Sequence, residues 1–240
     1  MTTTPIIEAR NLVMRFGGVV AVNDVSLSVA DGELRCLIGP NGAGKSTFFK
    51  CLTGQLTPTS GEVLFDGKPI TGLKSHEIAR LRVGIKTQVP NLFNGLTARE
   101  NVWLAARRNH VDRAAGKLAE AVMERFGVAA LAKRVVGELA HGQRQLVELA
   151  CVLAGEPRLI LLDEPAAGMT DEEVERITTV IREINRTTAL VVVEHDMQFI
   201  RQIARTVTVF HQGAVLVEDH VDAVLSNPMV RDVYLGKKAA

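Results

Sequence analysis

The segment Gly39–Thr47 combines glycines, a lysine and hydroxyl side chains at a spacing that suits the binding of phosphate groups. It matches the pattern GxxxxGK(S/T) and reads Gly39, Pro40, Asn41, Gly42, Ala43, Gly44, Lys45, Ser46, Thr47. The glycines let backbone N–H groups curl around phosphate oxygens, and the positive end of a following helix points at them. Lys45 adds a point charge for the β- and γ-phosphates, and Ser46 is placed to offer its hydroxyl to Mg²⁺. The segment therefore predicts a triphosphate site.

Two acids close the apolar stretch LILLDEP, Leu159–Pro165. Open α/β sheets bind their ligands at the carboxyl ends of strands, where this pair would lie. Asp163 is placed to hold Mg²⁺, and Glu164, on the other face of the strand, is the candidate to polarise an attacking water. Two such acids can also serve only as a helix cap. Next to a phosphate loop they favour a hydrolytic site.

The elements that must position these motifs alternate between strand and helix patterns. Leu34–Ile38 is an apolar run that leads into the glycine-rich loop, and Ser46–Leu52 follows as a helix. Leu159–Leu162 and Leu190–Val193 are continuous apolar runs, as parallel strands buried on both faces require. Between those runs lies a helix with a capping box at its start and one apolar face, formed by Thr170, Glu173, Val174, Ile177, Ile181 and Ile184. This order predicts an α/β fold with a mostly parallel sheet.

Two further regions flank this core. From Ile6 to Val29 the residues alternate as short strands, and Glu62–Phe65 with an Asp-Gly turn adds a hairpin. Between Gln88 and Glu156 the pattern becomes helical. We expect one domain over 1–240, in which 6–88 and 157–240 form the phosphate-binding core with its β layer and 89–156 a helical insertion.

Composition limits the classes of protein that remain. The 240 residues include 47% apolar and 23% charged residues, as in ordinary globular chains, and the net charge of +1 provides no global field for nucleic acid. Three cysteines without CxxC spacing indicate reduced thiols, which suits the cytosol. We expect no signal peptide, and the apolar runs are too short to span a bilayer. If a membrane is involved, another polypeptide is expected to cross it.

With LAHGQ, Leu139–Gln143, ahead of LILLDEP, the chain resembles ABC ATPases over essentially its whole length. The resemblance implies a RecA-like P-loop core, an N-terminal antiparallel β layer and a helical subdomain. It assigns Phe16 to stacking on adenine, and Gln88 to the γ-phosphate and metal site and its link to a membrane partner. His195, in VVVEHD, takes the place of the switch histidine that reaches the γ-phosphate.

The chain departs from the family pattern in two places. The usual signature is LSGGQ, so at Ala140 the serine hydroxyl that would bond the partner's γ-phosphate is missing, while the backbone amides and the helix start at His141, Gly142 and Gln143 remain. We expect weakened or rebalanced binding there. Thr170 also stands where the family has an acid, so communication across the dimer is expected to differ in detail.

Within the family, the segments GIKTQVPNLFNGLTARENVWLA and EPAAGMTDEE are most similar to the ATPases of importers for branched-chain amino acids, amides and urea. The resemblance implies ATP and Mg²⁺ as ligands and head-to-tail pairing with an identical or related subunit. It also implies separate permease subunits, an indirectly linked solute-binding protein and a peripheral place on the inner face of the cell membrane. Leu92 and Phe93 form a candidate docking lip for the permease, with a buried turn as the equal alternative.

Other functions remain as alternatives. A non-transport ABC ATPase acting on DNA or ribosomes would normally add a second nucleotide unit, a long coiled coil or a basic patch, and the sequence has none of these. A regulatory ATP-binding module is suggested by Ala140 and His141, whereas Glu164 and His195 favour turnover. A GTPase is disfavoured because an NKxD sequence is absent.

Overall fold

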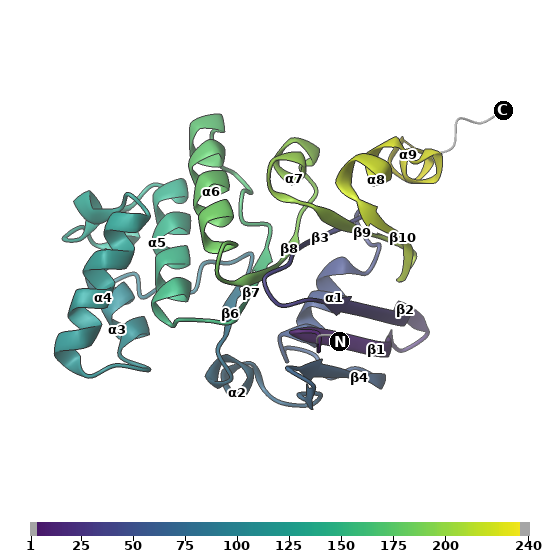
Figure 1. Cartoon of the computed structure of the whole chain (residues 1–240), viewed down its shortest axis with the longest axis horizontal. Coiled ribbons are helices and arrows are strands. Elements are labelled where there is room, and N and C mark those ends of the chain that lie inside the picture. The colour runs from purple at the N-terminus through teal and green to yellow at the C-terminus, as the bar shows by residue number, and fades with distance from the viewer. Residues whose placement is uncertain (1–3, 236–240) are drawn as a thin grey trace.

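The computed structural model describes residues 4–235, and its core is a six-stranded sheet of order β10-β9-β3-β8-β7-β6 (Figure 1). Its strands are β3 (Leu34–Ile38), β6 (Val83–Lys86), β7 (Leu159–Asp163), β8 (Ala189–Val193), β9 (Thr206–His211) and β10 (Ala214–His220). All neighbours pair in parallel except β10, which returns antiparallel to β9. The expected α/β class with a mostly parallel core is confirmed.

A second, antiparallel sheet of order β2-β1-β4-β5 forms the N-terminal layer. It consists of β1 (Ile7–Phe16), β2 (Val19–Val29), β4 (Ser60–Phe65) and β5 (Lys68–Pro69). Val25, Leu27 and Val29 of β2 are buried while the residues between them are exposed, which is the alternation that the sequence predicts. This sheet therefore has one face toward the core and one toward solvent.

The six-stranded sheet separates two hydrophobic cores. In β7, Leu159 and Leu161 pack toward the antiparallel sheet and α1 (Lys45–Leu52), whereas Ile160 and Leu162 pack toward the opposite layer of helices. Because side chains alternate along a strand, Asp163 shares the face of Leu161 and points toward α1. The pleat of one apolar strand thus brings an acid to the helix that follows the phosphate loop.

Helices cover the other face of the six-stranded sheet, opposite α1 (Figure 1). They are α6 (Asp171–Ile184), α7 (Met197–Ile203), α8 (Val221–Ser226) and α9 (Pro228–Leu235). Thr170 caps α6, since its hydroxyl accepts from Glu173 N at 3.4 Å while the Glu173 carboxylate accepts from Thr170 N at 3.0 Å. The expected capping box is present and fixes where α6 begins.

A helical region extends beyond β6, at the left of Figure 1. It is built from α3 (Ala98–Ala106), α4 (Asp112–Arg125) and α5 (His141–Ala154), with the short turns η1 (Ala129–Leu131) and η2 (Val136–Glu138), and α2 (Ser75–Arg80) lies before β6. Thr97 and Glu100 cap α3 reciprocally. Among residues 4–235 we find no helix with both the length and the hydrophobicity that crossing a bilayer requires.

Candidate functional site

The phosphate loop joins β3 to α1 and needs glycine for two separate reasons. Gly39 and Gly44 have φ of 148° and 102°, conformations that L side chains rarely adopt. A Cβ at Gly39 would lie 2.3 Å from the Phe210 carbonyl oxygen, and one at Gly44 would lie 2.4 Å from the Ala21 carbonyl oxygen. The loop therefore presses backbone to backbone against β9 and β2, which holds its N–H groups in place.

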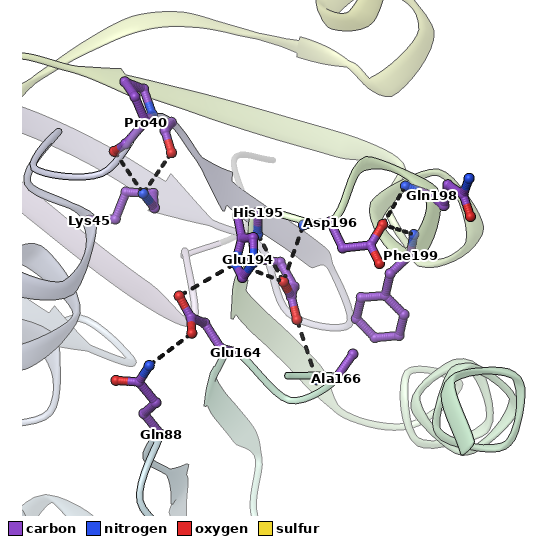
Figure 2. Close-up of polar contacts among 11 residues, drawn as sticks. Pro40, Lys45, Gln88, Glu164, Ala166, Glu194, His195, Asp196, Gln198 and Phe199 are labelled. Carbon is purple, nitrogen blue, oxygen red and sulfur yellow. Dashed lines mark hydrogen bonds and ion pairs between the residues drawn. The ribbon is translucent and has the colours of Figure 1, made fainter. Parts of the chain in front are cut away.

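Lys45, the first residue of α1, is buried at the base of this loop. Its Nζ donates to the carbonyl oxygens of Gly39 at 2.6 Å and Pro40 at 3.0 Å (Figure 2). Burial lowers the pKa of the ammonium, and the nearby Glu164 and Asp163 carboxylates act in the opposite direction. Because a phosphate oxygen is a stronger acceptor than a carbonyl oxygen, Lys45 is poised to exchange these bonds for a ligand.

A surface cleft of about 380 Å³ opens in front of the loop. It is lined by Phe16, Ala21, Asn41, Gly42, Ala43, Gly44, Lys45, Ser46, Thr47 and Glu164. Phe16 is half exposed at the end of β1, and Ser46 is exposed on the first turn of α1. The structure thus brings the expected adenine-stacking, phosphate-binding and hydrolytic side chains to one cleft.

The acid pair occupies the end of β7, with one difference from the sequence-based expectation. Asp163 is 8% exposed, and burial together with the Glu164 charge raises the pKa of its carboxyl to about 6. Glu164 does not simply continue the strand on its other face. β7 ends at Asp163, and Glu164 adopts a left-handed backbone with φ of 46°, uncommon for a non-glycine residue. A turn, not the pleat, therefore directs Glu164 into the cleft.

Gln88 and His195 converge on Glu164 from two other strand ends. Gln88 Nε2, two residues after β6, donates to Glu164 Oε2 at 2.9 Å. His195 Nδ1, two residues after β8, lies 3.5 Å from Glu164 Oε1 (Figure 2). The sequence singles out all three residues, and the parallel sheet places them together because its strands end at the same edge.

Glu194 is a site residue that the sequence reasoning missed. It is buried, and its carboxylate accepts from the backbone N–H groups of His195 at 2.8 Å, Asp196 at 3.3 Å and Ala166 at 3.3 Å. It therefore fixes both the turn that presents His195 and the loop after Glu164. The signal was available in VVVEHD, where an acid follows a buried strand directly and is expensive to bury without such partners.

The signature residues Ala140, His141, Gly142 and Gln143 form the start of α5, and none of these four described residues lines the cleft of Lys45. His141 Nε2 lies 3.0 Å from the Ala167 carbonyl oxygen, a hydrogen bond when Nε2 carries the proton. A Cβ at Gly142 would meet the Glu173 carboxylate at 2.0 Å. Within one chain the signature therefore rests on the loop after Glu164 and leaves the cleft open on that side.

Comparisons with known proteins decide the family. A family model described as ABC transporter matches residues 22–167. The high-affinity branched-chain amino acid transport ATP-binding protein BraF of Pseudomonas aeruginosa is 36% identical over 251 aligned residues, which cover 97% of this chain and 98% of BraF. This chain belongs to the ABC transporter family. The resemblance inferred from LAHGQ and LILLDEP is confirmed.

Solved structures agree with this placement. The ADP conformation of MJ1267, an ATP-binding cassette of an ABC transporter, has a TM-score of 0.87 and 28% identity over 98% of this chain and 100% of its own. A dimeric bacterial ABC transporter cassette, MJ0796, has a TM-score of 0.81 and 27% identity over 90% of this chain and 98% of its own. As an ABC ATPase, the chain is a nucleotide-binding, ATP-hydrolysing subunit, and this interpretation is favoured over the non-transport alternatives.

Proposed function

We propose that this ABC ATPase drives an importer for branched-chain amino acids or related amides, including urea, and that it hydrolyses ATP between Lys45 and Glu164. The observation that carries the hydrolytic role is the convergence of Gln88 and His195 on Glu164 beside the phosphate loop. The solute class is supported by the 36% identity to BraF, a branched-chain amino acid transport protein.

Each side chain has a separate task in this proposal. The amides of the phosphate loop and Lys45 bind the β- and γ-phosphates, and Phe16 stacks on the base. Glu164 polarises the attacking water while Gln88 orients its carboxylate through the 2.9 Å hydrogen bond. His195, exposed above Glu164, donates to the γ-phosphate as charge develops during transfer.

The oxygen donors at the cleft fit Mg²⁺, which prefers oxygen ligands and binds through one or two protein groups plus phosphates. The Ser46 hydroxyl is exposed in the cleft. Asp163 ends β7, and Gln88 lies two residues after the neighbouring strand β6. Burial is the main cause that raises the pKa of Asp163, and a bound divalent cation would lower that pKa again. The cation would neutralise charge on the transferred phosphate.

Two chains would complete each site head to tail. Of the signature residues at the start of α5, Ala140 and His141 are exposed, Gln143 is partly exposed and Gly142 is buried, and none of the four lines the cleft of their own chain. A helix N-terminus attracts phosphate, so in a dimer α5 of one subunit would face the ATP held by the other. The dimeric cassette MJ0796 supports this arrangement.

A second cleft, of about 500 Å³, is the proposed docking site for a permease on the inner face of the membrane. It is lined by residues of α2, β6, α3 and α5 and lies beside the loop that begins at Gln88. On that loop Val89 and Phe93 are 76% and 63% exposed, whereas Leu92 packs against the helical core. This exposure supports a docking lip formed by Val89 and Phe93, whereas Leu92 is partly buried in the turn.

The direct test replaces Glu164 with Gln and measures phosphate release, ATP binding and dimerisation. We expect turnover to fall by about a hundredfold or more, with ATP binding retained and an ATP-trapped dimer. Glu172→Gln, on the exposed start of α6, is the matched control and should retain turnover. Retained hydrolysis in Glu164→Gln would remove Glu164 from its role. ATP binding without phosphate release in the unaltered protein would instead favour a regulatory module.

A further inference from the structure

A buried ion pair joins β6 to the signature helix α5. Lys86, the last residue of β6, is 0% exposed, and Glu148 on α5 is 3% exposed. Their Nζ and Oε2 atoms are 3.8 Å apart, close enough for an ion pair and too far for a hydrogen bond. Gly84 on the same face of β6 has no room for a Cβ, which would lie 2.6 Å from Val152 Cγ1 of α5. Helix and strand therefore pack directly on each other around the pair.

Stability alone does not explain this pair. Burial lowers the pKa of Lys86 and raises the pKa of Glu148, so the surroundings disfavour both charges. Among the described residues neither Lys86 Nζ nor Glu148 Oε2 has a hydrogen-bond partner. A buried ion pair of this kind is commonly no more stable than apolar side chains of the same volume. The pair is therefore a candidate for a role in position rather than in folding.

The other oxygen of Glu148 holds the loop that begins at Gln88. Glu148 Oε1 accepts from Asn91 N at 2.8 Å, and Arg144, one turn earlier on α5, donates from Nη2 to Asn94 Oδ1 at 2.9 Å. Gln88 itself is bonded to Glu164. A continuous set of contacts thus runs from the hydrolytic carboxylate through this loop to the helix that carries the signature.

We propose that Lys86 and Glu148 are positioning residues, which fix the signature helix α5 to the Gln88–Asn94 loop so that a change at Glu164 moves the signature presented to the partner subunit. Lys86, at the end of β6, holds the Glu148 carboxylate in place. Because Glu148 accepts from Asn91 N, a displacement of the loop at Asn91 also displaces α5. The inference rests on the proposed function, because it assumes that α5 meets ATP bound by a second chain.

The first experiment titrates ATP-dependent dimerisation in the Glu164→Gln background, with monomer ATP affinity and thermal midpoint measured alongside. Glu148→Leu removes both the charge and the acceptor for Asn91 N–H, and Glu148→Gln keeps an acceptor. For Glu148→Leu we expect about tenfold more ATP at half-dimerisation and monomer affinity within about twofold, with Glu148→Gln in between. Lys86→Met should shift dimerisation in the same direction as Glu148→Gln.

Arg35→Met is the matched control for loss of a buried cation. Arg35 pairs with Glu33 and Glu218 at the far end of β3, away from α5. The thermal midpoint of Arg35→Met should fall, while its ATP concentration at half-dimerisation stays within about twofold of the background. An unchanged dimerisation midpoint in Glu148→Leu would overturn the proposal. An equal shift in Arg35→Met, or a parallel loss of monomer affinity in Glu148→Leu, would also overturn it, because a merely structural role predicts both.

The second experiment needs no dimer and therefore separates this inference from the proposed function. Amide hydrogen exchange is followed with and without ATP and Mg²⁺ at protein concentrations where light scattering shows only monomer. In the Glu164→Gln protein, ATP should change exchange both in the Gln88–Asn94 loop and in α5, and Glu148→Leu should confine the change to the loop. An ATP-dependent change in the exchange of α5 that persists in Glu148→Leu would contradict the proposal. If Glu164→Gln failed to dimerise, that result would count against the proposed function alone. Hydrogen exchange in the monomer would then decide the role of Glu148.

Discussion

Two helices of this ABC ATPase begin in similar ways and are held differently. α1 follows Gly44 and α5 follows Ala140, and neither of these N-terminal residues offers a side-chain cap to the first N–H groups. At the start of α1, Lys45 is buried and its Nζ is bonded to two carbonyl oxygens of the loop, whereas Ser46 is exposed to the cleft. At the start of α5, His141 is exposed and Gly142 is buried, and the Gln143 side chain accepts from Ala140 N at 3.2 Å.

In the proposed shared site, this difference separates a half held by backbone contacts from a half held by side chains. The phosphate loop is fixed by backbone contacts that no side-chain rotation can relax, such as those at Gly39 and Gly44. The signature is held by side chains, His141 against Ala167 and Glu173 against Gly142, which can rearrange. A rigid half and an adjustable half suit a site that assembles and separates in each cycle.

Loss of Lys45 should give the largest effect in the rigid half. Lys45→Ala removes the charge that we propose faces the phosphates, and we expect ATP affinity to fall by about a hundredfold or more in equilibrium binding. Lys50→Ala, exposed on the same helix, should leave affinity within about twofold. Unchanged affinity in Lys45→Ala would refute the phosphate-loop assignment.

Gly39→Ala tests whether backbone packing makes this half rigid. The new Cβ would clash with the Phe210 carbonyl, so urea unfolding should show a loss of about 3 kcal/mol. Gly42 also has a positive φ, of 79°, but a Cβ there would have no neighbouring atom within 4 Å. Gly42→Ala should therefore cost only about 1 kcal/mol. Equal losses would mean that strain and not packing sets the cost.

Asp163→Asn should change how stability depends on pH. The folded pKa of about 6 lies above the ordinary 3.8, so the folded state binds this proton more tightly than the unfolded chain does. Stability contributed by Asp163 is present below about pH 4 and is lost as pH rises to about 6. Without nucleotide or Mg²⁺, Asp163→Asn should be about 3 kcal/mol more stable than the parent at pH 7.5, and the gain should vanish near pH 4. A gain that is independent of pH would contradict this.

Ala140→Ser should give the smallest effect and probes the adjustable half. Ala140 has the extended backbone of an N-terminal capping residue, with φ of −59° and ψ of 157°. A serine there can cap α5, and we expect about 1 kcal/mol of added stability in urea unfolding. The hydroxyl should also lower the ATP concentration needed for dimerisation several-fold. Lower stability would show that the start of α5 is constrained by His141 and Glu173 more tightly than described.

The sequence predicts the phosphate loop and the acid pair after β7 well, because the spacing of neighbouring residues is enough to specify them. Three glycines with a lysine, and an apolar run closed by two acids, specify a strand, a loop and a helix without knowledge of distant residues. The structure places Gln88 and His195 beside Glu164, because both follow strands of a parallel sheet. Resemblance to a family supplies their roles.

The sequence does not predict the contacts that join distant elements. The Lys86–Glu148 pair, the Glu194 carboxylate that holds Ala166, and the left-handed turn at Glu164 all depend on tertiary packing. Periodicity describes which face of an element is apolar and says nothing about which polar group crosses to another element. For the same reason the sequence suggests Leu92 as well as Phe93 for the docking lip, although Leu92 packs inward.

The most direct test of a site shared between two chains mixes two inactive variants. Lys45→Ala lacks the charge that we propose binds phosphate, and Ala140→Asp places a repelling charge at the exposed N-terminal residue of the signature helix. In a mixed head-to-tail dimer, the intact loop of one chain meets the intact signature of the other, so phosphate release should return to about a quarter of the parent rate. A mixture as inactive as either variant alone would contradict the account.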